Sequence, residues 1–350
     1  MARNKKEEKL NYREELAKLK ATGPQRMYLL WGREDYLREQ YLTQLKSICL
    51  PEGESGFNFR RFDGPALSAE ALEEAIDSVP FLAERSFVEI RDADLNKLKD
   101  DVERIISAIK DIPEYCTVCF VQGPDYEPDG RIKLVKAIRS GGCEIKFTQQ
   151  EQGALLDWIS RRFAAHGKRI DFEAAQRLIF ISGDLMNRLI PEIDKIAAYC
   201  TGDRVEVRDV DAVATHTPEA QIFDLTDHIA EKRTNRAFDV LAELLANSDN
   251  EPIAILSVLG NQMRRLYFAR LCSDKGLRAK YLVDNGVIKY EFAAQQLMRL
   301  ARGFSLKQLE DAVELCANTD HLMKSGGGDR RELLKNAVLS ICVEAADAQG

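Results

Sequence analysis

The first candidate for chemistry is a phosphate-binding turn within the sequence MYLLWGREDYLREQ, residues 27–40. An apolar run ends at Gly32 and a helical pattern follows, which is the strand–turn–helix order of phosphate loops. A working loop also needs a second glycine and a Gly-Lys-Ser/Thr, whereas this chain continues with Arg33, Glu34 and Asp35. Two carboxylates at the start of a helix favour its dipole but repel phosphate. We therefore expect a helix capped by its own acids rather than an ATP site.

Two other stretches could pass for parts of a nucleotide site. In the sequence FVEIRDADL, Asp92 and Asp94 follow apolar residues and could hold magnesium. Magnesium would also need the phosphates of a nucleotide, which have no lysine to anchor them here. The glycine-rich sequence KSGGGDR, residues 324–330, lacks both the preceding strand and the following lysine of a phosphate loop. We interpret the carboxylates as solvated and the glycines as a flexible loop between helices.

One pair among the eight cysteines has the C-x-x-C spacing, Cys116 and Cys119 in EYCTVCFVQG. This segment alternates and is rich in Thr, Val and Phe, which predicts a strand, and residues three apart in a strand point to opposite faces. Such a pair cannot easily share a metal or close a disulfide. The four histidines are far apart, and the common zinc, hydrolase and dinucleotide motifs are absent. We expect reduced, buried cysteines, no catalytic residue, no metal and no cofactor.

The sequence SVPFLAERS, residues 78–86, carries an unusual apolar pair. Phe81 and Leu82 follow Pro80 in the segment where we expect a helix to end and a strand to begin. Neighbouring side chains in extended structure point in opposite directions, so one of the two should face solvent. Exposed apolar side chains on a loop often anchor a binding partner. Spacing alone nevertheless favours packing in the core.

A second unusual segment is NQMRRLYFARLCSDKGLRAK, residues 261–280. It places Arg264, Arg265 and Arg270 around the aromatic residues Tyr267 and Phe268. Basic and aromatic side chains together suit a nucleic-acid backbone. A solvated helix face is the commoner explanation of such a pattern. DNA contact by these arginines is therefore a hypothesis.

The elements that must position these residues fall into an α/β part and an all-α part. Strand-like segments at 26–32, 57–64, 85–92, 116–123 and 143–149 alternate with helical patterns, one of them at 98–110, which predicts a doubly wound parallel sheet of five strands. Beyond residue 150 helical patterns predominate, and Pro191 suggests that one of them is divided into two short helices. A boundary near Thr217 and Pro218 precedes a helical bundle.

Length and composition agree with a globular protein of two or three domains. The chain has 350 residues, of which 45% are hydrophobic and 31% charged. A formal net charge of −7 argues against a protein held to nucleic acid by bulk charge, although local basic faces remain compatible with it. No apolar run approaches the roughly 20 residues of a membrane span, and the N-terminus lacks the pattern of a signal peptide. We expect a cytoplasmic protein without a membrane segment.

A family resemblance appears when five segments are read in order. The sequences YLLWGREDYLREQ, SVPFLAERSFVEIRD, LIPEIDKIAAYC, IFDLTDHIAE and PIAILSVLGNQMRRLYFAR resemble the bacterial DNA polymerase III delta subunit. The similarity runs from about residue 25 to about residue 342. It implies a clamp-loader subunit with an AAA+-like layout and no ATPase activity of its own, within a DNA-directed DNA polymerase holoenzyme. A doubly wound enzyme that uses a nucleotide or a flavin is the alternative.

The resemblance also implies domains, partners and a site. It divides the chain into an N-terminal extension (1–24), a degenerate AAA+-like domain (25–148), a small helical lid (149–216) and a helical collar (217–350). The expected partners are the beta sliding clamp, other clamp-loader subunits of the gamma/tau and delta-prime types, and primed DNA through the assembled complex. By position in the family, Phe81 and Leu82, preceded by Pro80, correspond to the hydrophobic wedge that opens the clamp.

Overall fold

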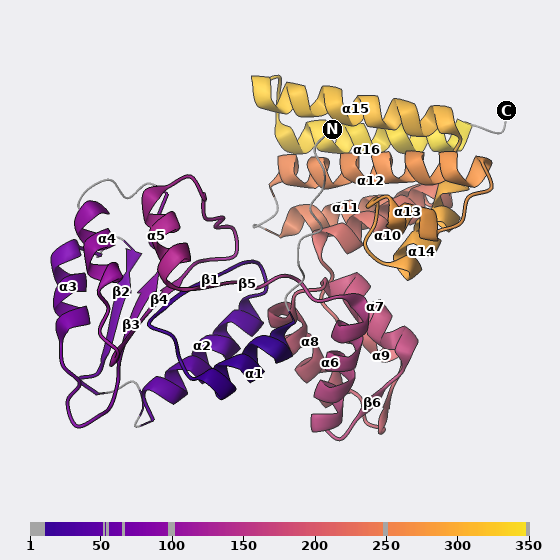
Figure 1. The fold of residues 1–350 in the computed structure, drawn as a ribbon. Coiled ribbons are helices and arrows are strands. Elements are labelled where there is room, and N and C mark those ends of the chain that lie inside the picture. The colour runs from indigo at the N-terminus through magenta and orange to yellow at the C-terminus, as the bar shows by residue number, and fades with distance from the viewer. Residues whose placement is uncertain are drawn as a thin grey trace. The chain divides into compact units, whose positions relative to one another are not determined.

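The computed structural model describes residues 11–51, 53, 56–64, 67–96, 102–247 and 251–347 (Figure 1). The chain divides into two compact units. The first comprises Met1–Glu151 with Leu185–Asn187, and the second comprises Gln152–Asp184 with Arg188–Gly350. Residues 98–101, where the predicted helix at 98–110 begins, lie outside the described part of the chain.

The first unit contains a parallel sheet of five strands in the order β2-β3-β4-β1-β5. The strands are β1 (Met27–Trp31), β2 (Phe59–Asp63), β3 (Ser86–Arg91), β4 (Cys116–Val121) and β5 (Cys143–Lys146). All residues of β1 and β4 are buried, as expected of parallel strands whose two faces are both covered. The predicted doubly wound sheet is confirmed.

Helices cover both faces of this sheet (Figure 1). They are α1 (Tyr12–Thr22), α2 (Asp35–Cys49), α3 (Ala69–Asp77), α4 (Val102–Lys110) and α5 (Lys133–Gly141). Met27, Leu29 and Trp31 of β1 share one hydrophobic cluster with α3, α4 and α5. Tyr28 points to the other face, where its ring lies 6.4 Å from that of Tyr41 in α2. This alternation is the two-residue period of a strand.

Helix α1 was not anticipated from the sequence, which suggested only an N-terminal extension there. Its pattern is mostly polar, and Leu19 is its buried residue. A single buried residue leaves little periodicity to detect, so the packing of α1 against α2 could be seen only in the tertiary structure.

The second unit begins with α6 (Gln152–Ala165), β6 (Arg169–Ile170), α7 (Phe172–Ser182), α8 (Met186–Tyr199), β7 (Arg204–Val205) and α9 (Val207–Val213). The two short strands pair in parallel. The expectation of two helices around Pro191 is wrong, because α8 continues through it. A proline inside a helix forfeits one backbone hydrogen bond. The complete burial of Leu189, Ile193 and Ile196 offsets that loss.

The rest of the second unit is a helical bundle, as predicted. It consists of α10 (Pro218–Ala230), α11 (Thr234–Ala246), α12 (Pro252–Asp274), α13 (Lys280–Asp284), α14 (Glu291–Ala301), α15 (Leu306–Ser325) and α16 (Arg330–Asp347). Helix α12 packs against α14, α15 and α16 around one hydrophobic cluster. Thr217 caps α10 and accepts the N–H of Ala220 at 3.3 Å, and Pro218 occupies the first helical turn. Across the described residues, each helix is too short or too polar to span a bilayer.

Candidate functional site

The turn after β1 has the chain order of a phosphate loop, but its glycine serves another purpose. Gly32 has a backbone φ of 115°, a value that residues other than glycine rarely adopt. A Cβ at this position would lie 2.4 Å from the carbonyl oxygen of Phe147, just beyond β5. The glycine is therefore required by the close approach of two backbone segments.

Protein groups occupy the start of α2. Glu34 is fully buried, and its Oε1 accepts the N–H of Met186 at 3.3 Å, a residue that clusters with the first unit. Asp35 pairs with Arg38 at 2.7 Å, and Arg38 also donates to the Gly32 carbonyl at 2.9 Å. The expectation that these acids cap their own helix is wrong, since Glu34 makes no side-chain capping hydrogen bond. The site expected to repel phosphate holds a buried carboxylate.

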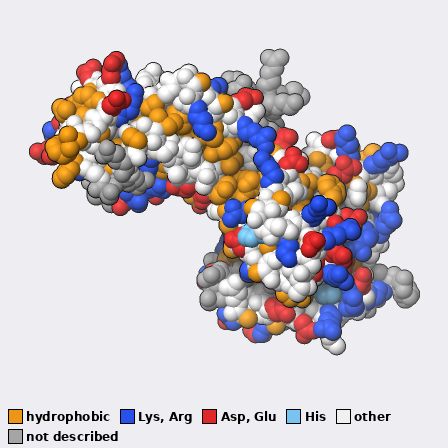
Figure 2. All heavy atoms as spheres, turned by 90° about the horizontal axis from the view of Figure 1, so that it is seen from below, with side chains coloured by type: hydrophobic (Ala, Val, Ile, Leu, Met, Phe, Trp, Pro, Cys, Tyr) orange, Lys and Arg blue, Asp and Glu red, His pale blue; other side chains and the backbone are white. Residues whose placement is uncertain are grey.

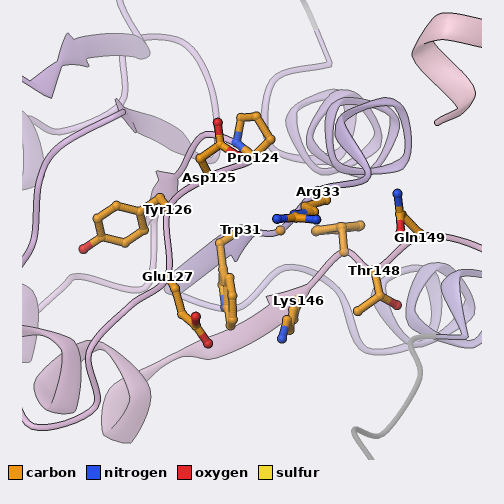
Figure 3. Close-up of a pocket in the computed structure, with 11 residues that line it drawn as sticks. Trp31, Arg33, Pro124, Asp125, Tyr126, Glu127, Lys146, Thr148 and Gln149 are labelled. Carbon is orange, nitrogen blue, oxygen red and sulfur yellow. The ribbon is translucent and has the colours of Figure 1, made fainter. Parts of the chain in front are cut away.

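A pocket of about 330 Å³ lies at the carboxyl ends of β1, β4 and β5 (Figure 3). Carboxyl ends of parallel strands are where ligands of doubly wound folds bind. Lys146 lies 4.8 Å from the ring centre of Trp31, whose Nε1 donates to Glu144 at 2.9 Å. The acids Asp125 and Glu127 also line the pocket, as do the bases Arg33 and Lys146. Equal numbers of acids and bases give no excess positive charge for a triphosphate.

The other chemical candidates are structural. Asp92 and Asp94 are exposed after β3, and the described residues contain no cluster of potential ligands able to hold a metal. Cys116 and Cys119 are completely buried in β4. Burial raises the pKa of the Cys116 thiol to about 11 and raises that of Cys119 well above its usual value. Both cysteines behave as small apolar side chains.

The segment between α3 and β3 is the exposed apolar feature of the α/β unit. Phe81 is 60% exposed and Leu82 is 84% exposed, so the core packing favoured by spacing alone is wrong for both residues. Val79 is also exposed, and Pro80 is half-buried. Figure 2 shows hydrophobic side chains gathered at the end of this unit. Folding leaves these side chains free to contact another molecule.

Phe57 extends this surface and was missed in the sequence. It is 74% exposed, and its ring lies 5.7 Å from that of Phe81 in an edge-to-face arrangement. The sequence suggested a strand from 57 to 64, but β2 begins at Phe59. Phe57 therefore precedes the strand in a turn, where the alternation rule does not apply. An aromatic residue next to Asn58, a common turn former, was the available signal.

The basic residues of α12 do not all share one environment. Arg264 and Arg265 are exposed, and Arg264 donates to Asn261 at 2.6 Å. Arg270 is half-buried and pairs with Asp274 at 3.2 Å. The aromatic neighbours Tyr267 and Phe268 pack against the helical core. These half-buried rings are less available to stack on bases, and Arg264 and Arg265 are more exposed than Arg270.

The sheet order, its helical layers and the helical second unit define an AAA+-like fold. A solved structure of similar fold is the Bacillus subtilis DNA clamp loader delta protein (YqeN). It is 22% identical with a TM-score of 0.52, and the match covers 95% of this chain and 99% of that one.

The sequence comparisons agree on one family. Residues 28–148 match the family model "DNA polymerase III, delta subunit", and residues 219–341 match "DNA polymerase III delta subunit, C-terminal domain". The DNA polymerase III subunit delta of Bacillus subtilis is 26% identical over 326 residues, covering 90% of this chain and 92% of that protein. A probable delta subunit of Aquifex aeolicus is 20% identical with 90% and 91% coverage.

The chain belongs to the DNA polymerase III delta subunit family. Its function is therefore that of a DNA polymerase III delta subunit, a component of the polymerase holoenzyme. The prediction made from the order of five sequence segments is confirmed.

Proposed function

We propose that this chain binds the beta sliding clamp and opens it, so that the clamp can be loaded on primed DNA. Phe81 and Leu82 are the anchor, and Pro80 shapes the chain before them. The observation that carries the proposal is the exposure of both anchor side chains at the position where the family has its wedge. Burying two such side chains in an apolar pocket gives about 1.5–3 kcal/mol each.

Opening follows from differential binding rather than from force. The anchor opens the clamp if it binds the open or relaxed clamp interface better than the closed one, because a ligand shifts an equilibrium only by its differential affinity. The chain needs no nucleotide for this step. ATP-dependent control would come from other subunits of the loader, of the gamma/tau and delta-prime types.

The organisation of the chain fits this role. We assign residues 25–148 to the clamp-binding module, 149–216 to a helical lid and 217–350 to the collar that joins the other subunits, with 1–24 as an extension. The assembled complex would act in the cytoplasm and hold primed DNA. Arg264 and Arg265 are the candidate contacts of the collar with that DNA, and Arg270 is the weaker candidate because Asp274 already pairs with it.

The test measures binding of the full chain to its cognate sliding clamp by surface plasmon resonance, without ATP. A Phe81→Ala/Leu82→Ala variant should lose at least about a hundredfold in affinity. A matched control is Phe172→Ala, which removes a 65% exposed phenylalanine from α7 in the second unit. Its affinity should equal that of the wild type.

The outcomes separate the parts of the proposal. Absence of binding by the wild type would overturn clamp binding by the free chain. Equal binding by the wild type and the double variant would place the contact elsewhere. Opening is read separately, from the rate at which the chain releases clamps from nicked circular DNA. Tight binding without faster release would contradict the opening role.

A further inference from the structure

The segment that carries the proposed anchor is irregular but fixed at its ends. The N–H of Ser78 donates to Glu74 at 3.1 Å where α3 ends, and the N–H of Ser86 donates to Tyr115 at 2.8 Å where β3 begins. The hydroxyl of Tyr115 also donates to the carbonyl of Asp77 at 3.2 Å. Between these points Phe81 and Leu82 belong to neither helix nor strand.

The side chain of Asn58 holds the middle of this segment. Its Oδ1 accepts the N–H of Phe81 at 2.6 Å, and its Nδ2 donates to the carbonyl of Phe81 at 2.9 Å. One amide thus satisfies both backbone groups of a single residue, as a neighbouring strand would. The main chain of Asn58 is itself tied to the sheet, since its carbonyl accepts the N–H of Phe87 at 2.8 Å.

The backbone next to this contact is strained. Leu82 has φ 51°, a left-handed conformation that non-glycine residues adopt at a cost. Such a conformation persists only where the surroundings impose it, and such residues concentrate at binding sites. Asn58 supplies two hydrogen bonds at the preceding residue, and the Phe57 ring packs edge-to-face on Phe81. Both contacts come from the turn before β2.

We propose that Asn58 is the positioning residue of the clamp contact, and that it holds Phe81 and Leu82 in the binding conformation before the clamp arrives. Phe57 supports it by packing against the Phe81 ring. This inference rests on the proposed clamp-binding role of Phe81 and Leu82. Asn58 does not touch the clamp in this mechanism, because its side-chain amide is already hydrogen-bonded to the Phe81 backbone.

A preset anchor makes a kinetic prediction. If only a fraction of molecules holds the binding conformation, the apparent dissociation constant rises by the reciprocal of that fraction. Losing the two hydrogen bonds of Asn58 should lower that fraction, and hence the affinity, about tenfold. The loss should appear in the association rate, while the dissociation rate of the formed complex stays close to that of the wild type.

The experiment compares Asn58→Ala with a matched control, Asn96→Ala, in binding to the sliding clamp. Asn96 makes a similar pair of bonds to another loop of the same unit, although to two residues rather than one. Its Oδ1 accepts the N–H of Asp129 at 3.0 Å, and its Nδ2 donates to the carbonyl of Glu127 at 3.2 Å. Asn58→Ala should associate about tenfold more slowly, and Asn96→Ala should bind as the wild type does. Equal behaviour of the two variants would overturn the proposal.

Dissociation rates distinguish positioning from direct contact. Asn58→Ala should slow association by the same factor in a Leu82→Ala background, because the populated fraction scales the affinity of whatever anchor remains. Clearly faster dissociation with Asn58→Ala would mean that Asn58 contacts the clamp itself, which contradicts the positioning role. The conservative variant Asn58→Asp keeps the acceptor for the Phe81 N–H and should restore part of the association rate.

A second measurement does not depend on the clamp. A Phe81→Trp reporter in a Trp31→Phe/Trp158→Phe background should show larger-amplitude motion by fluorescence anisotropy decay when Asn58→Ala is added, and unchanged motion when Asn96→Ala is added. Unchanged motion with Asn58→Ala would overturn the positioning role of Asn58. Failure of the wild type to bind the clamp would overturn the proposed function. The mobility measurement would still show whether Asn58 holds Phe81 in place.

Discussion

The backbone of Gly32 passes so close to Phe147 that a Cβ at position 32 would lie 2.4 Å from the Phe147 carbonyl oxygen. Strands β1 and β5 are neighbours in the sheet, and the N–H of Glu34 donates to the same carbonyl at 3.1 Å. The turn that resembles a phosphate loop in sequence is therefore closed by the chain itself.

Replacing Gly32 by alanine should destabilise the first unit by about 3 kcal/mol. The value combines a left-handed backbone conformation with an overpacked contact, each about 1–2 kcal/mol. Urea unfolding followed by Trp31 fluorescence in a Trp158→Phe background measures it. The control Gly56→Ala lies in the same unit, where an added Cβ would meet only the Asn58 nitrogen at 4.0 Å, and it should stay within about 1 kcal/mol of the wild type. Equal stability of the two variants would show that the β1 and β5 backbones can separate.

ATP should not stabilise the isolated chain. A nucleotide present at a hundred times its dissociation constant would add about 2.7 kcal/mol to the free energy of unfolding. The buried Glu34 carboxylate and the balanced charges of the pocket at Trp31 give phosphate no favourable site. Thermal unfolding with millimolar Mg-ATP should therefore match unfolding without it. A saturable rise in melting temperature would contradict this.

Thiol reactivity should be confined to one cysteine. Burial raises the pKa of Cys116, Cys316 and Cys342 to about 11, so these thiols stay protonated at pH 8 and ionise only as the pH rises through about 11. Cys143 is half-buried, whereas the other seven cysteines are buried. In the folded protein a thiol-specific reagent at pH 8 should label Cys143 first, slowly because burial raises its pKa too.

Mass spectrometry of the labelled protein locates the modified residue. Cys143→Ser should abolish the early labelling, and all eight cysteines of the wild type should react after denaturation. Early labelling of Cys116 in the native protein would show that β4 opens locally.

Removing Arg264 and Arg265 together should weaken the binding of primed DNA by the assembled clamp loader. Each lost phosphate contact reduces the salt dependence of binding, so the negative slope of log K against log[salt] should become shallower by about 1.8 for duplex DNA. Fluorescence anisotropy at several salt concentrations measures the slope. Arg270→Ala is the comparison and should change it less, because Asp274 already neutralises this arginine. An unchanged slope in the double variant would show that Arg264 and Arg265 belong to a solvated helix face and do not contact the DNA.

Local sequence patterns were sufficient for most of the secondary structure. The five strands and the helical bundle follow from periodicity, and Ser68, a residue type common at helix starts, caps α3 by accepting the N–H of Ala71 at 3.2 Å. The failures have tertiary causes. Helix α8 continues through Pro191 because its buried leucine and isoleucines hold it, and α1 forms with only one buried side chain to mark it.

The candidate site divides in the same way. The missing glycine and lysine residues argued against a phosphate loop, and the order of motifs identified the family. Sequence spacing could not say that Phe81 and Leu82 are exposed, because exposure depends on which segments cover a loop. It also could not find the contacts that shape the site.

Asn58 and Phe81 are 23 residues apart, and Gly32 and Phe147 are separated by most of the α/β unit. The sequence by itself determined most of the elements and the family, because these depend on residue types and local periodicity. The tertiary structure decided which side chains face solvent and which residues hold them there. Contacts between distant segments form only when the strand order β2-β3-β4-β1-β5 brings their ends together.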